Sequence, residues 1–160
     1  MDVLAVKVLN EVIPKAPGPR VPRKNPVDYW PTPVLLERAA YLRKMAALGD
    51  GSASETLKEF SHHFTMLCFR SRDSIVELDE NFTCLLYVLD GRATLVTGRM
   101  VVGAEELNSR EIHDVSIADD TRQEIRAGDV VNIPPGLARQ MLVSGERTVT
   151  YFVIKIQEAP

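Results

Sequence analysis

CLLYVLDGRATLVTG, residues 84–98, and GDVVNIPPGLARQML, residues 128–142, decide the fold of this chain. Both stretches are rich in β-branched and aromatic residues, interrupted by Gly, Asp, Asn and Pro, a composition typical of short strands. The Asp90-Gly91 dipeptide predicts a hairpin turn inside the first stretch. Similar segments lie on either side, with no alternation of strand and helix, so we expect an all-β antiparallel barrel or sandwich. The expected strands are residues 62–69, 83–91, 92–98, 101–103, 114–118, 124–135, 139–144 and 148–156.

A helix is expected before the strands. Thr32 is a candidate cap, Pro33 suits the first helical position, and Gly49 marks the end. The apolar stripe of this helix consists of Leu35, Ala39, Leu42 and Ala46. We expect a second, short helical turn in SETLKEF, residues 54–60, with Ser54 as its cap.

Upstream of the helix, seven of the ten prolines lie between Pro14 and Pro33. Proline fixes φ and has no N–H to donate, so we expect this stretch to be an extended arm. We expect the arm to lie on its own barrel or on a partner subunit, with Tyr29 and Trp30 as apolar anchors. The predicted organisation is one domain, with an arm over 1–32, a helical segment over 33–60 and a barrel over 61–160.

Composition sets limits on location and partners. The 160 residues suit one domain, and 45% hydrophobic with 26% charged residues is ordinary for a globular fold. A net charge of −3 argues against nucleic acid as a partner, although the arm is locally basic. No apolar run is long enough for a bilayer, no secretory leader is evident, and two cysteines are too few for a disulfide scaffold. We therefore expect a cytoplasmic protein without membrane contact.

The two opening stretches resemble the paired motifs of the cupins, small β-barrels of the jelly-roll type. Gly128, Pro134 and Gly136 fall at the spacing of the second cupin motif. The resemblance covers about residues 60–156 and implies a cupin-like antiparallel jelly-roll barrel, here with an N-terminal α-helix and a proline-rich arm. It also implies pairing through the sheets, so a homodimer is expected.

Cupins usually hold a divalent metal through histidines and one carboxylate, but this chain departs from that pattern at each ligand. Arg139 stands at the second-motif histidine, Cys84 at the first-motif acid, and the histidine positions fall on 77–80, which contain no histidine. The nearest subgroup pattern places its single histidine on Asp79. Arginine stays protonated and cannot ligate a cation. We therefore predict no metal and no cofactor.

The resemblance places Asp79 and Arg139 at the mouth of the barrel, which predicts an ion pair at the former metal position. A purely structural role would fix strand register, since buried pairs are often neutral for stability. A functional role would make Arg139 the holder of a carboxylate, enolate or phenolate, with Asp79 orienting that group or acting as base.

Alternation predicts the lining of the barrel. Cys84, Leu86 and Val88 share one face of their strand, which family analogy turns inward, and Met141 lies on the same face as Arg139. These side chains and Phe152 are the predicted substrate-binding walls. A barrel filled completely by side chains is the structural alternative.

The remaining reactive groups are histidine and cysteine. His62 and His63 are adjacent at a strand start, so one should face inward, where it would serve as an auxiliary proton carrier; a strand-edge histidine bonded to backbone or water is the plainer alternative. Cys84 near Arg139 could be nucleophilic, but a buried cysteine most often behaves as a small apolar residue.

The leading functional hypothesis is a metal-independent enzyme of isomerase, cyclase or lyase type that acts on a small organic substrate. Analogy with other cupins that have lost their metal ligands suggests the biosynthesis of a specialised metabolite as its setting. Its catalytic residues would be Arg139, Asp79, His63 and His62. One alternative is a non-catalytic protein that binds a small anionic molecule. A second alternative is a metal-dependent cupin oxygenase with atypical ligands.

Overall fold

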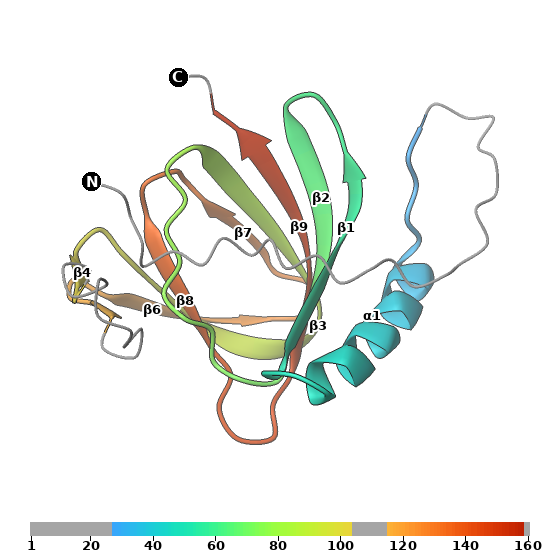
Figure 1. The fold of residues 1–160 in the computed structure, drawn as a ribbon, viewed down its shortest axis with the longest axis horizontal. Helices are drawn as coiled ribbons and strands as arrows, with labels where there is room; N and C mark the ends of the chain where they lie inside the picture. Colours follow the sequence, from blue (N-terminus) through green and yellow to red (C-terminus); the bar gives the residue numbers. More distant parts are fainter. Residues whose placement is uncertain (1–26, 104–114, 159–160) are drawn as a thin grey trace.

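The computed structural model describes residues 27–103 and 115–158, which form an antiparallel β-barrel with one helix against its side (Figure 1). Most of the expected proline-rich arm falls in residues 1–26, outside the described residues. The helix is α1 (Thr32–Ala47). The strands are β1 (Ser52–Glu59), β2 (His63–Arg70), β3 (Phe82–Gly98), β4 (Val101–Val102), β5 (Ser116–Ile117), β6 (Thr121–Arg126), β7 (Val130–Ile133), β8 (Ala138–Leu142) and β9 (Val149–Gln157).

All strand pairs are antiparallel, in the order β1-β2-β9-β3-β6, with β7 and β8 also pairing with β3. The long strand β3 therefore links both halves of the barrel. β4 and β5 form a separate small ribbon. The sheet arrangement confirms the all-β antiparallel class expected from the sequence.

The expected hairpin at Asp90-Gly91 is wrong, because β3 runs through this dipeptide without reversing. The register of β3 with β9 shifts between Val88 and Asp90, and Gly91 has a φ of 78°. A Cβ at Gly91 would collide with the backbone of Thr148, the residue just before β9. The turn residues thus make a β-bulge that bends one strand from one half of the barrel into the other.

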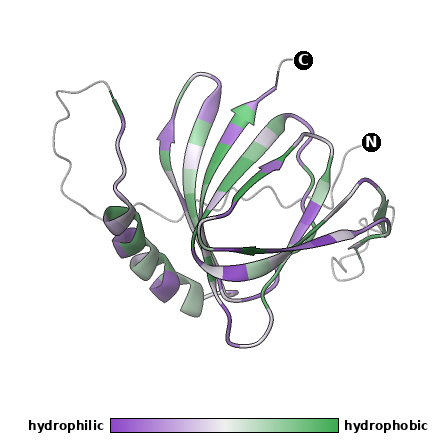
Figure 2. Cartoon of the chain, turned by 180° about the vertical axis from the view of Figure 1, so that it is seen from behind, coloured by the Kyte–Doolittle hydropathy of each residue, from purple (hydrophilic) through white to green (hydrophobic). Residues whose placement is uncertain are grey.

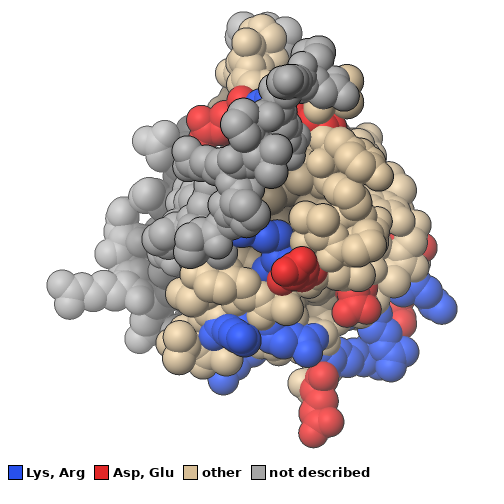
Figure 3. All heavy atoms as spheres, turned by 90° about the vertical axis from the view of Figure 1, so that its right-hand side faces the viewer, with Lys and Arg blue, Asp and Glu red and all other residues tan. Residues whose placement is uncertain are grey.

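α1 confirms the expected apolar stripe, because Leu35, Ala39, Leu42 and Ala46 are its buried residues. Pro31, not Thr32, precedes the first turn, and no side chain caps it. Figure 3 shows this side of the molecule, with basic and acidic side chains intermingled along the lower edge. In the described chain, α1 lacks the length and apolarity that a bilayer crossing would require.

The expected second helical turn is also wrong, because SETLKEF belongs to β1, and the helical part of 33–60 ends at Ala47. β1 pairs with β2 over almost its whole length, from Ser52 opposite Arg70 to Glu59 opposite Phe64. These ladder hydrogen bonds outweigh the weak local preference of a Ser- and Glu-rich segment for helix.

The core has two main parts, one inside the barrel and one between α1 and the outer face of β1 and β2. Figure 2 shows apolar and polar residues alternating along the strands, as expected when successive side chains point to opposite faces. Cys84, Leu86 and Val88 belong to the interior cluster, as predicted. Leu89 and Phe152 pack instead against the cluster that α1 covers.

Candidate functional site

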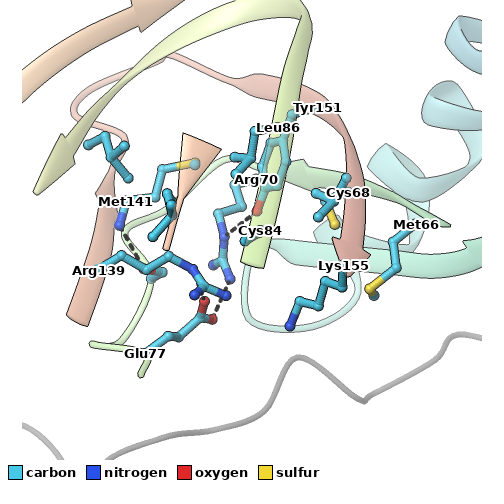
Figure 4. Close-up of a pocket in the computed structure, with 14 residues that line it drawn as sticks. Met66, Cys68, Arg70, Glu77, Cys84, Leu86, Arg139, Met141, Tyr151 and Lys155 are labelled. Atoms are coloured by element: carbon cyan, nitrogen blue, oxygen red, sulfur yellow. Dashed lines mark hydrogen bonds and ion pairs between the residues drawn. The ribbon is translucent and has the colours of Figure 1, made fainter. Parts of the chain in front are cut away.

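A group of charged side chains lies inside the barrel among apolar residues (Figure 4). Arg70 comes from the end of β2, Arg139 from β8 and Lys155 from β9, and Glu77 comes from the segment after β2. Each is less than 9% exposed. Strand alternation explains why the three basic side chains point into the barrel, since each continues the inward-facing row of its strand.

Glu77 owes its position to backbone pairing with β8. Its N–H donates to the Arg139 carbonyl and its carbonyl accepts from the Arg139 N–H, both at 2.8 Å, so the two residues face each other across a β-bridge. Nearby, the Ser74 N–H donates to the Met141 carbonyl and the Ser74 hydroxyl accepts from the Met141 N–H. The segment after β2 therefore follows the edge of β8 and turns Glu77 into the barrel.

The expected ion pair between Asp79 and Arg139 is wrong in its acidic partner. Arg139 Nε lies 3.4 Å from Glu77 Oε2, and Arg70 Nη2 lies 3.6 Å from Glu77 Oε1. Asp79 Oδ2 is instead 3.6 Å from Lys155 Nζ. Glu77 and Asp79 share an alternation face, but the bridge places Glu77 directly opposite Arg139.

Glu77 is incompletely satisfied. Its Oε1 is buried and has no hydrogen-bond partner among the described residues. Burial raises the pKa of Glu77 above its ordinary value, although Arg139 and Arg70 pull it the other way. A buried carboxyl group with a raised pKa and a spare oxygen is suited to carry a proton in acid–base chemistry.

The arginines supply fixed positive charge. Burial opposes the charge of Arg139, but the acidic groups around it, Cys84 and Glu77 among them, outweigh that effect and raise its pKa. Arg70 also stays charged, and its Nε donates to the Tyr151 hydroxyl at 3.4 Å. The arrangement is able to stabilise negative charge that develops on a bound oxygen.

Two spaces meet at these residues. The interior cavity measures about 20 Å³, enough for one water-sized group. A cleft of about 460 Å³ opens beside it, lined by the end of α1, by β1 and β2, and by the segment after β2. Four residues line both spaces: Cys68, Arg70, Glu77 and Tyr151. A small molecule that occupied the cleft would therefore reach Glu77.

The predicted walls are partly right. Cys84, Leu86 and Met141 line the interior cavity. Val88 is fully buried in the interior core but does not line the cavity. Phe152 is wrong as a wall, because β9 turns it outward, where its ring lies 5.9 Å from that of Trp30.

The predicted proton carriers His62 and His63 lie away from the cavity. His62 is exposed, and His63 stacks on Phe60 with ring centroids 4.2 Å apart. Inward rows on β2 hold even-numbered residues such as Met66 and Cys68, so His63 faces outward. Neither histidine lines the interior cavity or the cleft.

A nucleophilic role for Cys84 gains no support. Burial raises the pKa of the Cys84 thiol, although Arg139 and Lys155 oppose that effect. Burial likewise raises the pKa of Cys68, to about 12. Because the thiolate is the reactive form, both cysteines are suited to core packing rather than to attack on a substrate.

Sequence reasoning missed Glu77, Arg70, Lys155 and Tyr151 as site residues. A signal for two of them was present, because Arg70 and Lys155 are basic residues that continue the inward rows of otherwise apolar strands. Glu77 carried no such signal, since it lies in an irregular segment whose facing residue is set by the pairing with β8.

The donor set does not fit the divalent metal that a cupin fold implies. The acids near the expected position, Glu77 and Asp79, are already paired with Arg70, Arg139 and Lys155. In the described residues, no three His, Cys, Asp or Glu side chains are grouped as a metal site would require. A cation placed here would be repelled by three positive charges.

Comparison with known proteins supports the fold. No family model matches the chain, and no curated protein matches it in sequence. The cupin domain of Cnp3 from Schizosaccharomyces pombe superposes with a TM-score of 0.50 at 12% identity, over 67% of this chain and 65% of that one. The chain therefore has a cupin fold.

Two further solved structures are similar at lower scores. The polyketide cyclase RemF from Streptomyces resistomycificus has a TM-score of 0.49 at 17% identity, over 69% of this chain and 68% of that one. A protein with a double-stranded β-helix domain from Klebsiella pneumoniae has a TM-score of 0.49 at 12% identity, over 66% of this chain and 76% of that one.

Proposed function

We propose that this cupin-fold protein is a metal-independent enzyme that moves a proton on a small organic substrate, in an isomerase, cyclase or lyase reaction. Glu77 would carry the proton, and Arg139 with Arg70 would stabilise the oxyanion that forms. Asp79 would act indirectly by holding Lys155. His62 and His63 would take no part in this chemistry.

One observation carries the proposal. Glu77 is 5% exposed and lies between two arginines at the junction of the interior cavity and the cleft, and within the described part of the chain one of its carboxylate oxygens accepts no hydrogen bond. A group needed only for stability would be expected to have all its hydrogen bonds satisfied, because an unmet buried acceptor costs about 1–3 kcal/mol. The spare oxygen therefore favours a role towards a ligand.

The cleft supports binding of a small molecule. Its volume of about 460 Å³ lies in the range of ligand pockets, and its wall combines apolar side chains such as Phe69 and Ile75 with the charged residues at its floor. The interior cavity is too small for a whole substrate, so the body of the substrate would lie in the cleft.

The test is proton exchange on an enolisable ketone. We expect the protein to accelerate deuterium uptake from D₂O into 2-tetralone next to its carbonyl, followed by NMR. Glu77→Gln and Arg139→Gln should each lower that rate about 100-fold, as loss of a general base or oxyanion donor does. Arg122→Gln, at an exposed residue that lines neither the interior cavity nor the cleft, is the matched control and should change nothing.

Chelators distinguish this proposal from the metal-dependent alternative. EDTA should leave the exchange rate unchanged. Loss of exchange with EDTA, restored by a divalent metal, would overturn metal independence. Binding of 2-tetralone without exchange would favour the non-catalytic binding protein. The homodimer and the cytoplasmic location expected from the sequence stay predictions.

A further inference from the structure

Resting on the function proposed above, we propose that the group held at Glu77 is a weakly acidic hydroxyl, that of a phenol or an enol. Its oxygen would enter the interior cavity and its carbon skeleton would lie in the cleft. The inference rests on the mixture of donors and acceptor around the cavity, on the size of the two spaces and on the residues that they share.

The inventory of polar groups selects a hydroxyl. Among the described residues, Glu77 Oε1 accepts no hydrogen bond, although Arg70 Nη2 lies 3.6 Å away as an ion-pair partner. The three cations around it lie 3.4–3.6 Å from their carboxylates, longer than the most favourable hydrogen-bond distance, so their N–H groups have capacity for a closer acceptor. Only a group that donates once and accepts more than once satisfies both sides, as a hydroxyl does.

Other ligand chemistries meet a conflict. An ammonium would donate to Glu77 but would face Arg70, Arg139 and Lys155. A carboxylate would suit those cations but would place two acceptor oxygens against the unpaired oxygen of Glu77. A ketone would accept from the cations but would offer Glu77 only a C–H proton, so it satisfies the site fully only after it has become an enol. A weak acid avoids each conflict, because its proton bridges to Glu77.

Size places the two parts of the ligand. About 20 Å³ admits one oxygen atom but no ring. The cleft of about 460 Å³ meets the cavity at Arg70, Glu77 and Tyr151, and Met45 and Phe69 are among its apolar wall residues. An aromatic or enolic skeleton in the cleft would thus point its hydroxyl inward.

The proton step follows from this placement. The O–H bond of the ligand breaks, the proton passes to Glu77 Oε1, and the electron pair stays on the ligand oxygen as a phenolate or enolate. Arg139 and Lys155 then face the new negative charge, and Glu77 becomes neutral. Burial favours that neutral form, because it raises the pKa of Glu77.

The experiment uses the full chain with 4-nitrophenol, whose phenolate absorbs visible light. A pH titration of bound 4-nitrophenol should give an apparent pKa about 1–3 units below that of the free compound, as a nearby cation produces. Arg139→Gln should abolish the shift. Glu77→Gln should preserve or enlarge it, because the competing negative charge is gone. Arg122→Gln should behave as wild type.

Each further outcome decides the question. If Glu77→Gln does not fold, Lys155→Met serves in its place and should reduce the shift while Glu77 is retained. A bound 4-nitrophenol with an unshifted pKa, or a shift that survives Arg139→Gln, would overturn the inference. So would no binding of 4-nitrophenol by wild type.

The inference and the proposed function fail differently. In one outcome, benzoate binds in a way that depends on Arg139, exchange on 2-tetralone is normal, and bound 4-nitrophenol gives no phenolate signal. That outcome would reject a hydroxyl as the ligand group but would leave the proposed enzymatic function intact. In the opposite outcome, the pKa of bound 4-nitrophenol is lowered but 2-tetralone shows no exchange. That outcome would reject the proposed enzymatic function and leave the hydroxyl-binding site intact.

Discussion

Two buried glutamates of this protein are each paired with arginine, and they differ in how well they are satisfied. Glu55, between α1 and β1, accepts from Arg38 Nε at 2.8 Å and from Arg38 Nη2 at 2.6 Å. Glu77, inside the barrel, has two arginines at 3.4 Å and 3.6 Å, and one of its oxygens accepts no hydrogen bond from residues 27–103 or 115–158. Burial is similar, at 1% and 5% exposed.

The difference separates an interaction that fixes the fold from one that is available to a ligand. A bidentate pair uses both oxygens of the carboxylate and aligns α1 on the sheet. The looser arrangement at Glu77 holds charge in place without consuming its hydrogen-bonding capacity. Stability should therefore depend mainly on the first pair, and ligand binding on the second.

The largest effect is expected from Arg38→Met, which leaves Glu55 buried without its partner. Unfolding free energy should fall by about 3 kcal/mol, as for other broken buried pairs. Urea denaturation followed by circular dichroism measures this change. The 4-nitrophenol titration should be unaffected, and a changed phenolate pKa would show that the two regions are coupled.

Glu77→Gln should cost less stability, about 1–2 kcal/mol, because the amide resembles the protonated carboxyl that burial favours. The same urea experiment compares it with Arg38→Met. A loss equal to or greater than that of Arg38→Met would break the comparison, since Glu77 would then be as important to the fold as Glu55.

A third prediction concerns pH. The folded protein holds the Cys68 thiol with a pKa of about 12, against 9.0 for an unperturbed thiol, because the thiol is fully buried. Between these values the unfolded chain releases a proton that the folded protein keeps, so stability falls as pH rises. Cys68 alone should lower the unfolding free energy by about 1 kcal/mol between pH 9 and pH 10.

Urea midpoints at both pH values test this slope, with Cys68→Ala as the matched variant. The slope should be shallower in Cys68→Ala, although Cys84 and Tyr151, whose pKa values burial also raises, maintain part of it. An unchanged slope would contradict burial as the cause.

The smallest effect is expected from Arg92→Ala, at an ion pair with Glu124 in which both side chains are largely exposed. Its N–O distance is 3.9 Å. Water screens such a pair, so the unfolding free energy should change by about 0.5 kcal/mol or less. A larger loss would show that surface pairs also contribute and would weaken the contrast between Glu55 and Glu77.

Much of the site was predictable from alternation together with the cupin resemblance, which identified the inward face. Cys84, Leu86, Arg139 and Met141 face inward because their strands have period two. Alternation also places Phe152 outside the barrel, because it lies one residue after the inward-facing Tyr151. The hairpin at Asp90-Gly91 failed because the same residues serve a bulge as well as a turn.

The sequence by itself determined the class of fold and the stripe of α1, because these depend on local periodicity, and its resemblance to cupins determined that Arg139 faces inward. Tertiary structure decided the acidic partner of Arg139. Glu77 and Asp79 are two residues apart and share a face, so only the bridge between the segment after β2 and β8 distinguishes them. Whether a carboxylate is fully or only partly satisfied is likewise a matter of its distances to residues far away in the chain.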